Sequence, residues 1–124
     1  MNVIEQARQA YAPTQRGIRT NRSIEAQLIS QITARMTQAA KAYPENFPAL
    51  VSALDDNRRM WRALAIDVAD DDNGLPQALR AQLFYLAEFT EQHSRKVLER
   101  RAGLEALIDI NTAVLRGLNG HGAA

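Results

Sequence analysis

The chain has 124 residues, the size of one domain that buries a core without disulfides or metal. It contains no cysteine, which excludes disulfides, thiolate metal sites and a cysteine nucleophile. Its 15 basic and 14 acidic side chains leave a net charge of +1, which is too small to indicate a polyanionic ligand.

Residues 1–19 are predicted to form a short helix at about Val3–Tyr11 and a connector that contains Pro13 and Gly17. The opening residues lack the basic flank and apolar run of a secretory signal, and no apolar run approaches membrane-spanning length. We therefore expect a cytoplasmic protein without membrane insertion.

Residues 20–119 are predicted to form a bundle of four main helices, because apolar residues recur at alternating spacings of three and four. Thr20 is expected to cap the first of these helices, and Pro44 to end it at about Tyr43. Pro48 fits the first turn of the second helix, where the missing N–H costs little. No strand is expected, because period-two alternation never lasts.

The turn Asn73-Gly74 is expected to end the second long helix, with Pro76 in the opening turn of the third. Asn73 can either adopt a left-handed conformation or cap the new helix. Gly103 is expected to separate the last two helices, and residues 120–124 to form a flexible tail. Together these boundaries predict an all-α fold, an antiparallel bundle of four main helices plus a short N-terminal helix.

Two asparagines, Asn57 and Asn111, fall on helix stripes that are otherwise apolar. A buried amide without a partner costs about 1–3 kcal/mol, so they are expected to bond to each other, to the backbone, or to His93 or Arg80. Two interpretations stay open: the amides fix helix register, or one of them lines a groove for a partner helix. Trp61 has the same ambiguity, because its indole N–H needs a partner.

The sequence offers little for catalysis or metal binding. Its two histidines are His93, on a helix stripe, and His121, in the expected tail. A calcium loop starting at Asp70 would need glycine and glutamate where the chain has Leu75 and Ala81. We therefore predict a protein that is not an enzyme and that holds no metal or cofactor.

Three arginines, Arg58, Arg59 and Arg62, lie close together on one helix and could meet the phosphates of a nucleic acid. Asp55 precedes the first two by three and four residues, so local ion pairs absorb part of this charge. The only aromatic residue among them is Trp61, which the apolar stripe includes. The pattern disfavours nucleic acid as a partner.

Three blocks of residues stand out in chain order: Ala53-Leu54 with Asn57-Arg58-Arg59 and Trp61; Asn73, Leu75-Pro76 and Leu79-Arg80; and Ile110-Asn111 with Gly117-Leu118. Together they resemble the signature of the FlaF family of bacterial flagellar biosynthesis proteins, and with Ala10-Tyr11 and the helix start at 20–28 the likeness covers nearly the whole chain. One departure is the first long helix, which begins with Thr20-Asn21-Arg22-Ser23 where family members often have a turn like Ser-Pro-Arg-Glu.

The resemblance implies a protein that binds flagellin before secretion and promotes its synthesis and export, alongside an opposing flagellar regulator. Flagellin ends are amphipathic helical segments that are disordered before assembly, and a helical bundle could hold one in an apolar groove. An alternative is a post-transcriptional regulator that contacts flagellin messenger RNA through the arginine-rich helix face.

Apolar residues off the main stripes are candidates for the partner-binding surface, although they are equally well interpreted as edges of wide core faces. We also hypothesise that the N-terminal segment, residues 1–19, detaches and uncovers the groove. The apolar candidates are Phe84, Leu98 and Ile110, together with Val3 and Tyr11 in the N-terminal segment.

Overall fold

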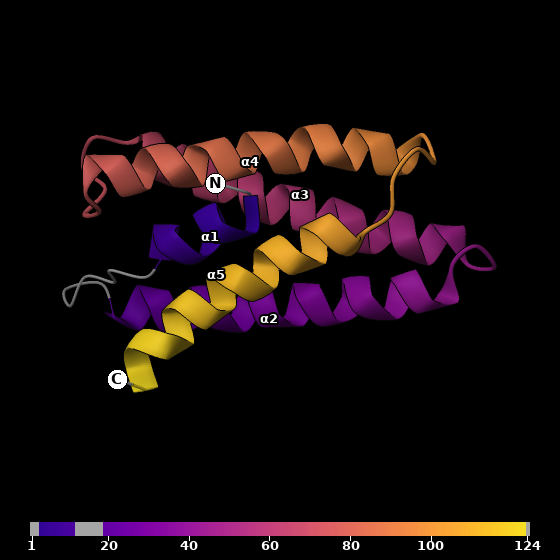
Figure 1. The fold of residues 1–124 in the computed structure, drawn as a ribbon, viewed down its shortest axis with the longest axis horizontal. Helices are drawn as coiled ribbons and strands as arrows, with labels where there is room; N and C mark the ends of the chain where they lie inside the picture. Colours follow the sequence, from indigo (N-terminus) through magenta and orange to yellow (C-terminus); the bar gives the residue numbers. More distant parts are fainter. Residues whose placement is uncertain (1–2, 12–18, 124) are drawn as a thin grey trace.

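The computed structural model describes residues 3–11 and 19–123, with side chains placed for 3–7 and 25–117. Five helices and no strand lie within these residues, which confirms the predicted all-α fold (Figure 1). The helices are α1 (Val3–Tyr11), α2 (Arg19–Ala42), α3 (Phe47–Ala69), α4 (Gln77–Leu98) and α5 (Glu105–Ala123).

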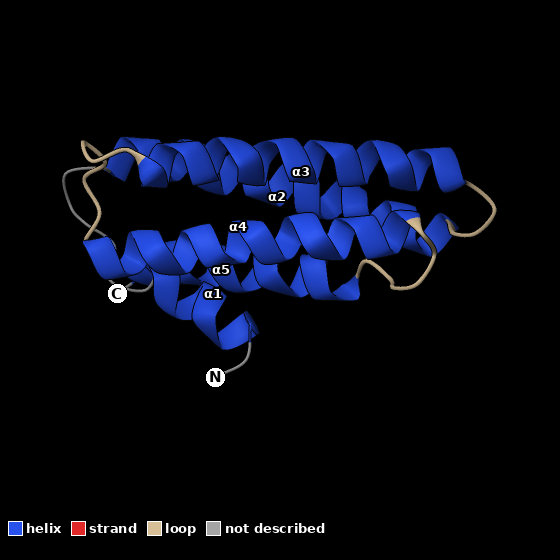
Figure 2. Cartoon of the chain, turned by 90° about the horizontal axis from the view of Figure 1, so that it is seen from above, coloured by secondary structure: helices blue, strands red, loops and turns tan. Residues whose placement is uncertain are grey.

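The four long helices run antiparallel to their sequence neighbours, as the bundle prediction requires (Figure 1). Helix α3 packs against α2 and α4, and α5 packs against α2. Helices α4 and α5 are not a closely packed pair; α1 lies against both of them, on the side away from α2 and α3 (Figure 2). The short helix therefore completes a ring of five helices, a position that helical periodicity does not predict.

Proline and asparagine set the junction between α2 and α3. Helix α2 ends at Ala42, close to the end predicted from Pro44, and Pro48 lies in the first turn of α3 as predicted. Asn46 caps α3, because its side-chain oxygen accepts from the Ala49 N–H at 3.2 Å.

The start of α2 differs from the prediction. The helix begins at Arg19, so Thr20 lies inside it and is not its N-cap. At the other end of the chain, α5 continues to Ala123, and the backbone shows no break after residue 119, where we expected the tail to begin.

The connection between α3 and α4 also differs. Helix α3 ends at Ala69, before Asn73-Gly74, and its C-cap is Asp70. Asn73 is not left-handed; its side-chain oxygen accepts from the Leu75 N–H at 3.0 Å, so it closes the turn instead of capping the helix. Pro76 occupies the N-cap position of α4, one residue before its first turn.

The core consists of two apolar clusters separated by a polar layer along the bundle axis. The first cluster lies at the end that carries α1, which we call the α1 end; its buried members are Ala7, Ile29, Trp61, Val68, Leu83, Leu86, Ala87, Ile110, Ala113 and Val114. The second cluster lies at the other end; its buried members are Met36, Ala39, Leu50, Ala53, Leu54, Val97, Leu104 and Leu107. The polar layer between them contains Thr33, Asn57, Thr90, Ser94 and Asn111.

Candidate protein-binding surface

A hydrogen-bonded chain of three side chains crosses the centre of the bundle. The Trp61 indole N–H donates to the Asn111 side-chain oxygen at 3.0 Å, and the Asn111 amide N–H donates to the Asn57 side-chain oxygen at 2.8 Å. All three side chains are buried. The prediction that the two asparagines bond to each other is confirmed, and the chain joins α3 to α5 across the core.

The other proposed partners of these amides bond elsewhere. His93 Nε2 lies 3.0 Å from the Gly103 carbonyl oxygen, next to the α4–α5 connection. Arg80 Nη1 donates to the carbonyl of Asp70 at 2.9 Å and to that of Val68 at 3.4 Å. Arg80 therefore satisfies the C-terminal carbonyls of α3 from the first turn of α4.

The polar layer is not fully satisfied. Within the described residues, Asn57 Nδ2 and Thr90 Oγ1 are buried without a hydrogen-bond partner. Each buried group without a partner lowers the stability of the fold, whereas the two hydrogen bonds of Asn111 stabilise it. The layer thus fixes how the helices are paired and lies away from the surface, which favours the register interpretation of the asparagines.

The arginines of α3 are paired with carboxylates. Glu91 on α4 accepts hydrogen bonds from Arg58 and, at 3.1 Å, from Arg62, and Arg95 approaches it at 3.7 Å. Because Arg58 donates to the Glu91 carboxylate, the pKa of that carboxyl falls from 4.5 to about 2, against the effect of its burial. The same contact raises the pKa of Arg58.

Arg59 forms the remaining ion pair on this face, at 3.1 Å from Asp55, as its spacing in the sequence predicts. Glu91 was not a candidate residue at the sequence level, because its partners Arg58 and Arg62 lie about thirty positions away and only packing of α3 on α4 brings them together. The only local signal is Arg95, one helical turn after it.

The apolar candidates divide between surface and core. Phe84 is 42% exposed on α4, whereas Ile110 is 1% exposed and belongs to the first cluster, so its prediction as a surface residue is wrong. The reason is that α5 has neighbours on two sides, α2 and α1, and its apolar stripe is correspondingly wide. Leu98 is half-buried against the second cluster, and Val3 is half-buried against the first.

Two residues of the sequence prediction have side chains outside the described set. Tyr11 is the last residue of α1, and Leu118 lies in α5, but only their backbones are described. Gly117 is buried within α5, and Leu75 is half-buried against the first cluster.

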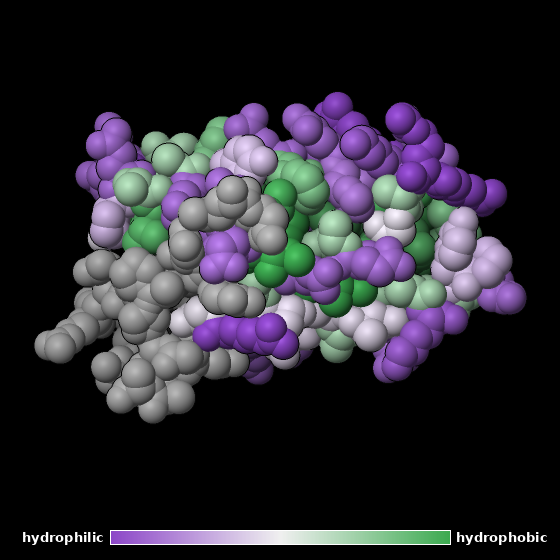
Figure 3. Space-filling model, in the orientation of Figure 1, coloured by the Kyte–Doolittle hydropathy of each residue, from purple (hydrophilic) through white to green (hydrophobic). Residues whose placement is uncertain are grey.

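Further apolar side chains reach the surface at the α1 end. Tyr85 is 46% exposed beside Phe84, and Leu28 on α2 is 45% exposed. Ile66 on α3 is 75% exposed. On the face drawn in Figure 3, hydrophobic residues reach the surface in the middle of the molecule, between polar side chains along its edges.

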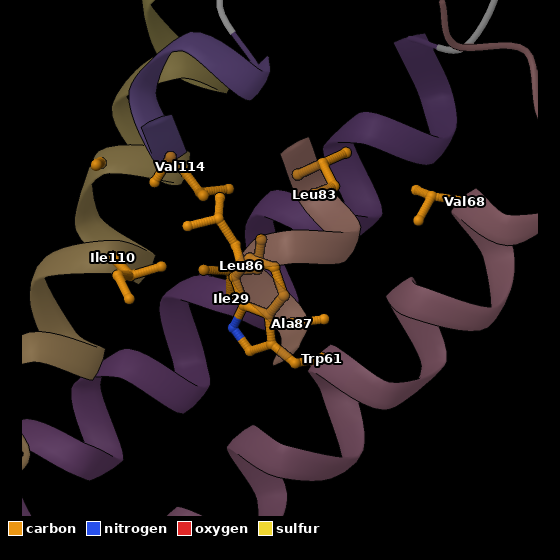
Figure 4. Close-up of a cluster of buried hydrophobic side chains, with 10 residues drawn as sticks. Ile29, Trp61, Val68, Leu83, Leu86, Ala87, Ile110 and Val114 are labelled. Atoms are coloured by element: carbon orange, nitrogen blue, oxygen red, sulfur yellow. The ribbon is translucent and has the colours of Figure 1, made fainter. Parts of the chain in front are cut away.

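A groove of about 200 Å³ lies between α2 and α3 at the same end. Its wall is mainly apolar and includes Leu28, Ile29, Met60, Trp61 and Leu64, with Glu25 and Asp67 also lining it. Trp61 contributes to the wall of this groove and to the core, where its ring lies among Ile29, Leu86 and Ala87 (Figure 4). The exposed apolar side chains and this groove make the α1 end the candidate protein-binding surface.

The residues described hold no group of three or more His, Cys, Asp or Glu side chains that could bind a metal ion. No helix among them is both long enough and apolar enough to cross a membrane.

Comparison with known proteins gives one match. The model of a family described as flagellar protein FlaF matches residues 7–118, which leaves out only six residues at each end of the chain. No curated protein and no solved structure matches the chain.

Proposed function

Because the chain belongs to the FlaF family of flagellar proteins, we propose that it binds flagellin and promotes its synthesis and export as a chaperone or secretion adaptor. In this role the chain catalyses no reaction and acts by binding another protein. The opposing flagellar regulator that the family resemblance implies would be a further partner.

The observation that supports this proposal is the apolar surface of the α1 end. Leu28, Phe84, Tyr85 and Ile66 are each at least 42% exposed, and an apolar groove lies beside the first of them. Tyr43, the other large hydrophobic side chain that is exposed among the described residues, lies at the opposite end of the bundle at 40%. An apolar groove with an exposed apolar side chain such as Leu28 in its wall is typical of a protein-binding site. The ends of flagellin, as amphipathic helical segments, offer a complementary apolar face.

Apolar burial as the source of affinity has a measurable consequence. Salt screens interactions between exposed charges but hardly affects the transfer of apolar surface out of water. Binding of flagellin to the α1 end should therefore depend little on salt concentration.

The alternative, direct contact with flagellin messenger RNA, draws no support from the arginine face. Arg58 and Arg62 share Glu91, and Arg59 pairs with Asp55. A phosphate would have to compete with these carboxylates, and binding would then fall steeply as salt rises.

The test is a titration of purified flagellin into the purified chain at about 50 mM and about 500 mM salt, with the flagellin messenger RNA leader as a second ligand. We expect a stoichiometric complex with flagellin whose Kd changes less than about threefold between the two salts. Phe84→Ala with Tyr85→Ala should weaken it, and Arg59→Ala, an exposed change on another face, should not. Absence of a flagellin complex, or RNA binding that salt and Arg59→Ala abolish, would refute the proposal.

A further inference from the structure

The groove between α2 and α3 at the α1 end is suited to one kind of partner segment. We infer that it receives an amphipathic helix that inserts a large aliphatic side chain and carries a lysine or arginine one helical turn away. This inference rests on the proposed function, because it names the chemistry of the flagellin segment that binds. The residues that line the groove belong to α2 and α3.

The groove is large enough for a side chain and reaches from the surface to the core. Its volume is about 200 Å³, whereas a cavity of about 150 Å³ holds a benzene ring. Trp61 and Ile29 line it and are buried in the first cluster. Leu28, at 45% exposure, and Ala63 line it and are exposed. An aliphatic side chain in this groove would cover Leu28 and contact the half-buried Met60, so its burial supplies affinity.

The charged residues that line the groove are acidic. Glu25 comes from α2 and Asp67 from α3, so each wall contributes one carboxylate. They lie about one helical turn from Leu28 and Ala63, on the side of the α1 end. No lysine or arginine is among the described residues that line the groove. A helix with a basic side chain one turn from its aliphatic anchor is therefore complementary in charge to these walls.

An ion pair limits the groove on the side of the second cluster. Arg35 on α2 donates to Asp56 on α3 across the seam between the two helices. Beyond this pair lies a second depression, lined by alanines and polar side chains and by no large apolar residue. Glu25 and Arg35 are about 15 Å apart along α2 at 1.5 Å per residue. The apolar groove therefore accommodates about three turns of a partner helix.

The carboxylates select the partner more than they hold it. Asp67 is exposed and accepts from Asn73 Nδ2 at 3.1 Å, and Glu25 is half-buried. Ion pairs between exposed groups add little to affinity and are screened by salt, whereas charge complementarity excludes wrong partners. The aliphatic contact thus supplies affinity and the basic residue supplies specificity, in agreement with the weak salt dependence expected of flagellin binding.

The first test places a lysine in the groove. Ala63→Lys puts an ammonium group one turn before Asp67, where the helix tolerates it and where it repels the partner's basic side chain. Ala78→Lys, at an exposed alanine in the first turn of α4, is the matched control. Flagellin titrated into the full-length proteins should bind Ala63→Lys at least about tenfold more weakly and Ala78→Lys within about twofold of the unaltered chain. A loss of less than about threefold in Ala63→Lys overturns the inference and leaves the proposed function intact.

Synthetic peptides test the same groove without flagellin. Two amphipathic helical peptides of about 15 residues share one aliphatic face and differ one turn after the central leucine, where one has lysine and the other glutamate. The lysine peptide should bind the unaltered chain at least about fivefold more tightly. Asp67→Lys should reverse this preference, and Asp109→Lys, at an exposed carboxylate on α5, should leave it unchanged. Replacing the central leucine of the lysine peptide by alanine should abolish binding.

The outcomes distinguish the inference from the proposed function. If flagellin binds none of the proteins but the peptides show the preference and its reversal, the proposed function fails and the groove chemistry stands. Equal binding of the two peptides, or binding of neither, overturns the inference. Circular dichroism checks that Asp67→Lys keeps its fold; if it does not, Asp67→Asn, which retains an acceptor for Asn73, should remove the preference instead.

Discussion

At the scale of single residues, Asn111 is the central member of the hydrogen-bonded chain. Its side chain accepts from Trp61 and donates to Asn57, whereas Asn57 makes only one of these bonds and also carries an unpaired buried N–H. The two asparagines look equivalent in the sequence, since each interrupts an apolar stripe. Packing of α5 against the rest of the bundle is what makes them different.

We expect Asn111→Leu to lower the free energy of unfolding by about 2–4 kcal/mol, because it leaves Trp61 and Asn57 with unpaired buried groups. Asn57→Leu should cost less, about 1–2 kcal/mol, since it strands only the Asn111 amide and removes an N–H that already lacks a partner. Urea unfolding of both variants measures the difference. Equal losses would contradict this hierarchy, and flagellin binding lost from a normally packed Asn57→Leu protein would give that residue a binding role.

Glu91 is the residue through which pH should act. Its pKa is lowered from 4.5 to about 2 in the folded protein, so its contribution to stability is present above about pH 4.5 and is lost as the pH falls toward 2. We expect Glu91→Gln to destabilise the protein by roughly 1–2 kcal/mol at pH 7, because Arg58 loses a charged partner. Measured from pH 7 down to pH 2.5, the difference between the variant and the unaltered chain should shrink; a constant difference would exclude this cause.

At the scale of the helices, local sequence signals predicted where a helix begins and ends better than they predicted which helices pack against each other. Pro44 and Pro48 act within one turn of their own backbone, and the boundaries they predicted are the ones observed. Asn73 failed as a predictor of the end of α3, because a turn residue can bond forward to Leu75 as easily as it can cap a helix. The placement of α1 between α4 and α5 depends on contacts between residues more than 60 positions apart, which periodicity does not encode.

Arg80 joins two helices by bonding from α4 to the last carbonyls of α3. We expect Arg80→Ala to cost about 1–2 kcal/mol and to lower Tm by about 3–8 °C. Arg101→Ala is the control, since that side chain is 68% exposed and pairs only with exposed Glu99. Thermal unfolding compares them, and an equal, small shift in both variants would mean that the carbonyls of α3 do not need Arg80.

At the scale of the whole molecule, the two ends of the bundle differ. The second cluster is closed by long helices, whereas the first is closed partly by α1 and is surrounded by exposed Leu28, Phe84 and Tyr85. The polar layer separates the two clusters. This difference between the two ends follows from the packing of the helices and not from any one sequence motif.

The most direct test of flagellin binding at the α1 end is hydrogen exchange of the full chain with and without flagellin. In the free chain, α1 should exchange faster than the turns of α3 and α4 that carry Asn57 and Thr90. With flagellin bound, exchange should slow on the helix turns that carry the proposed binding surface, residues 25–29, 60–67 and 83–86. Slowing confined to the second cluster or to the Arg59 face, or no change at all, would contradict the proposal.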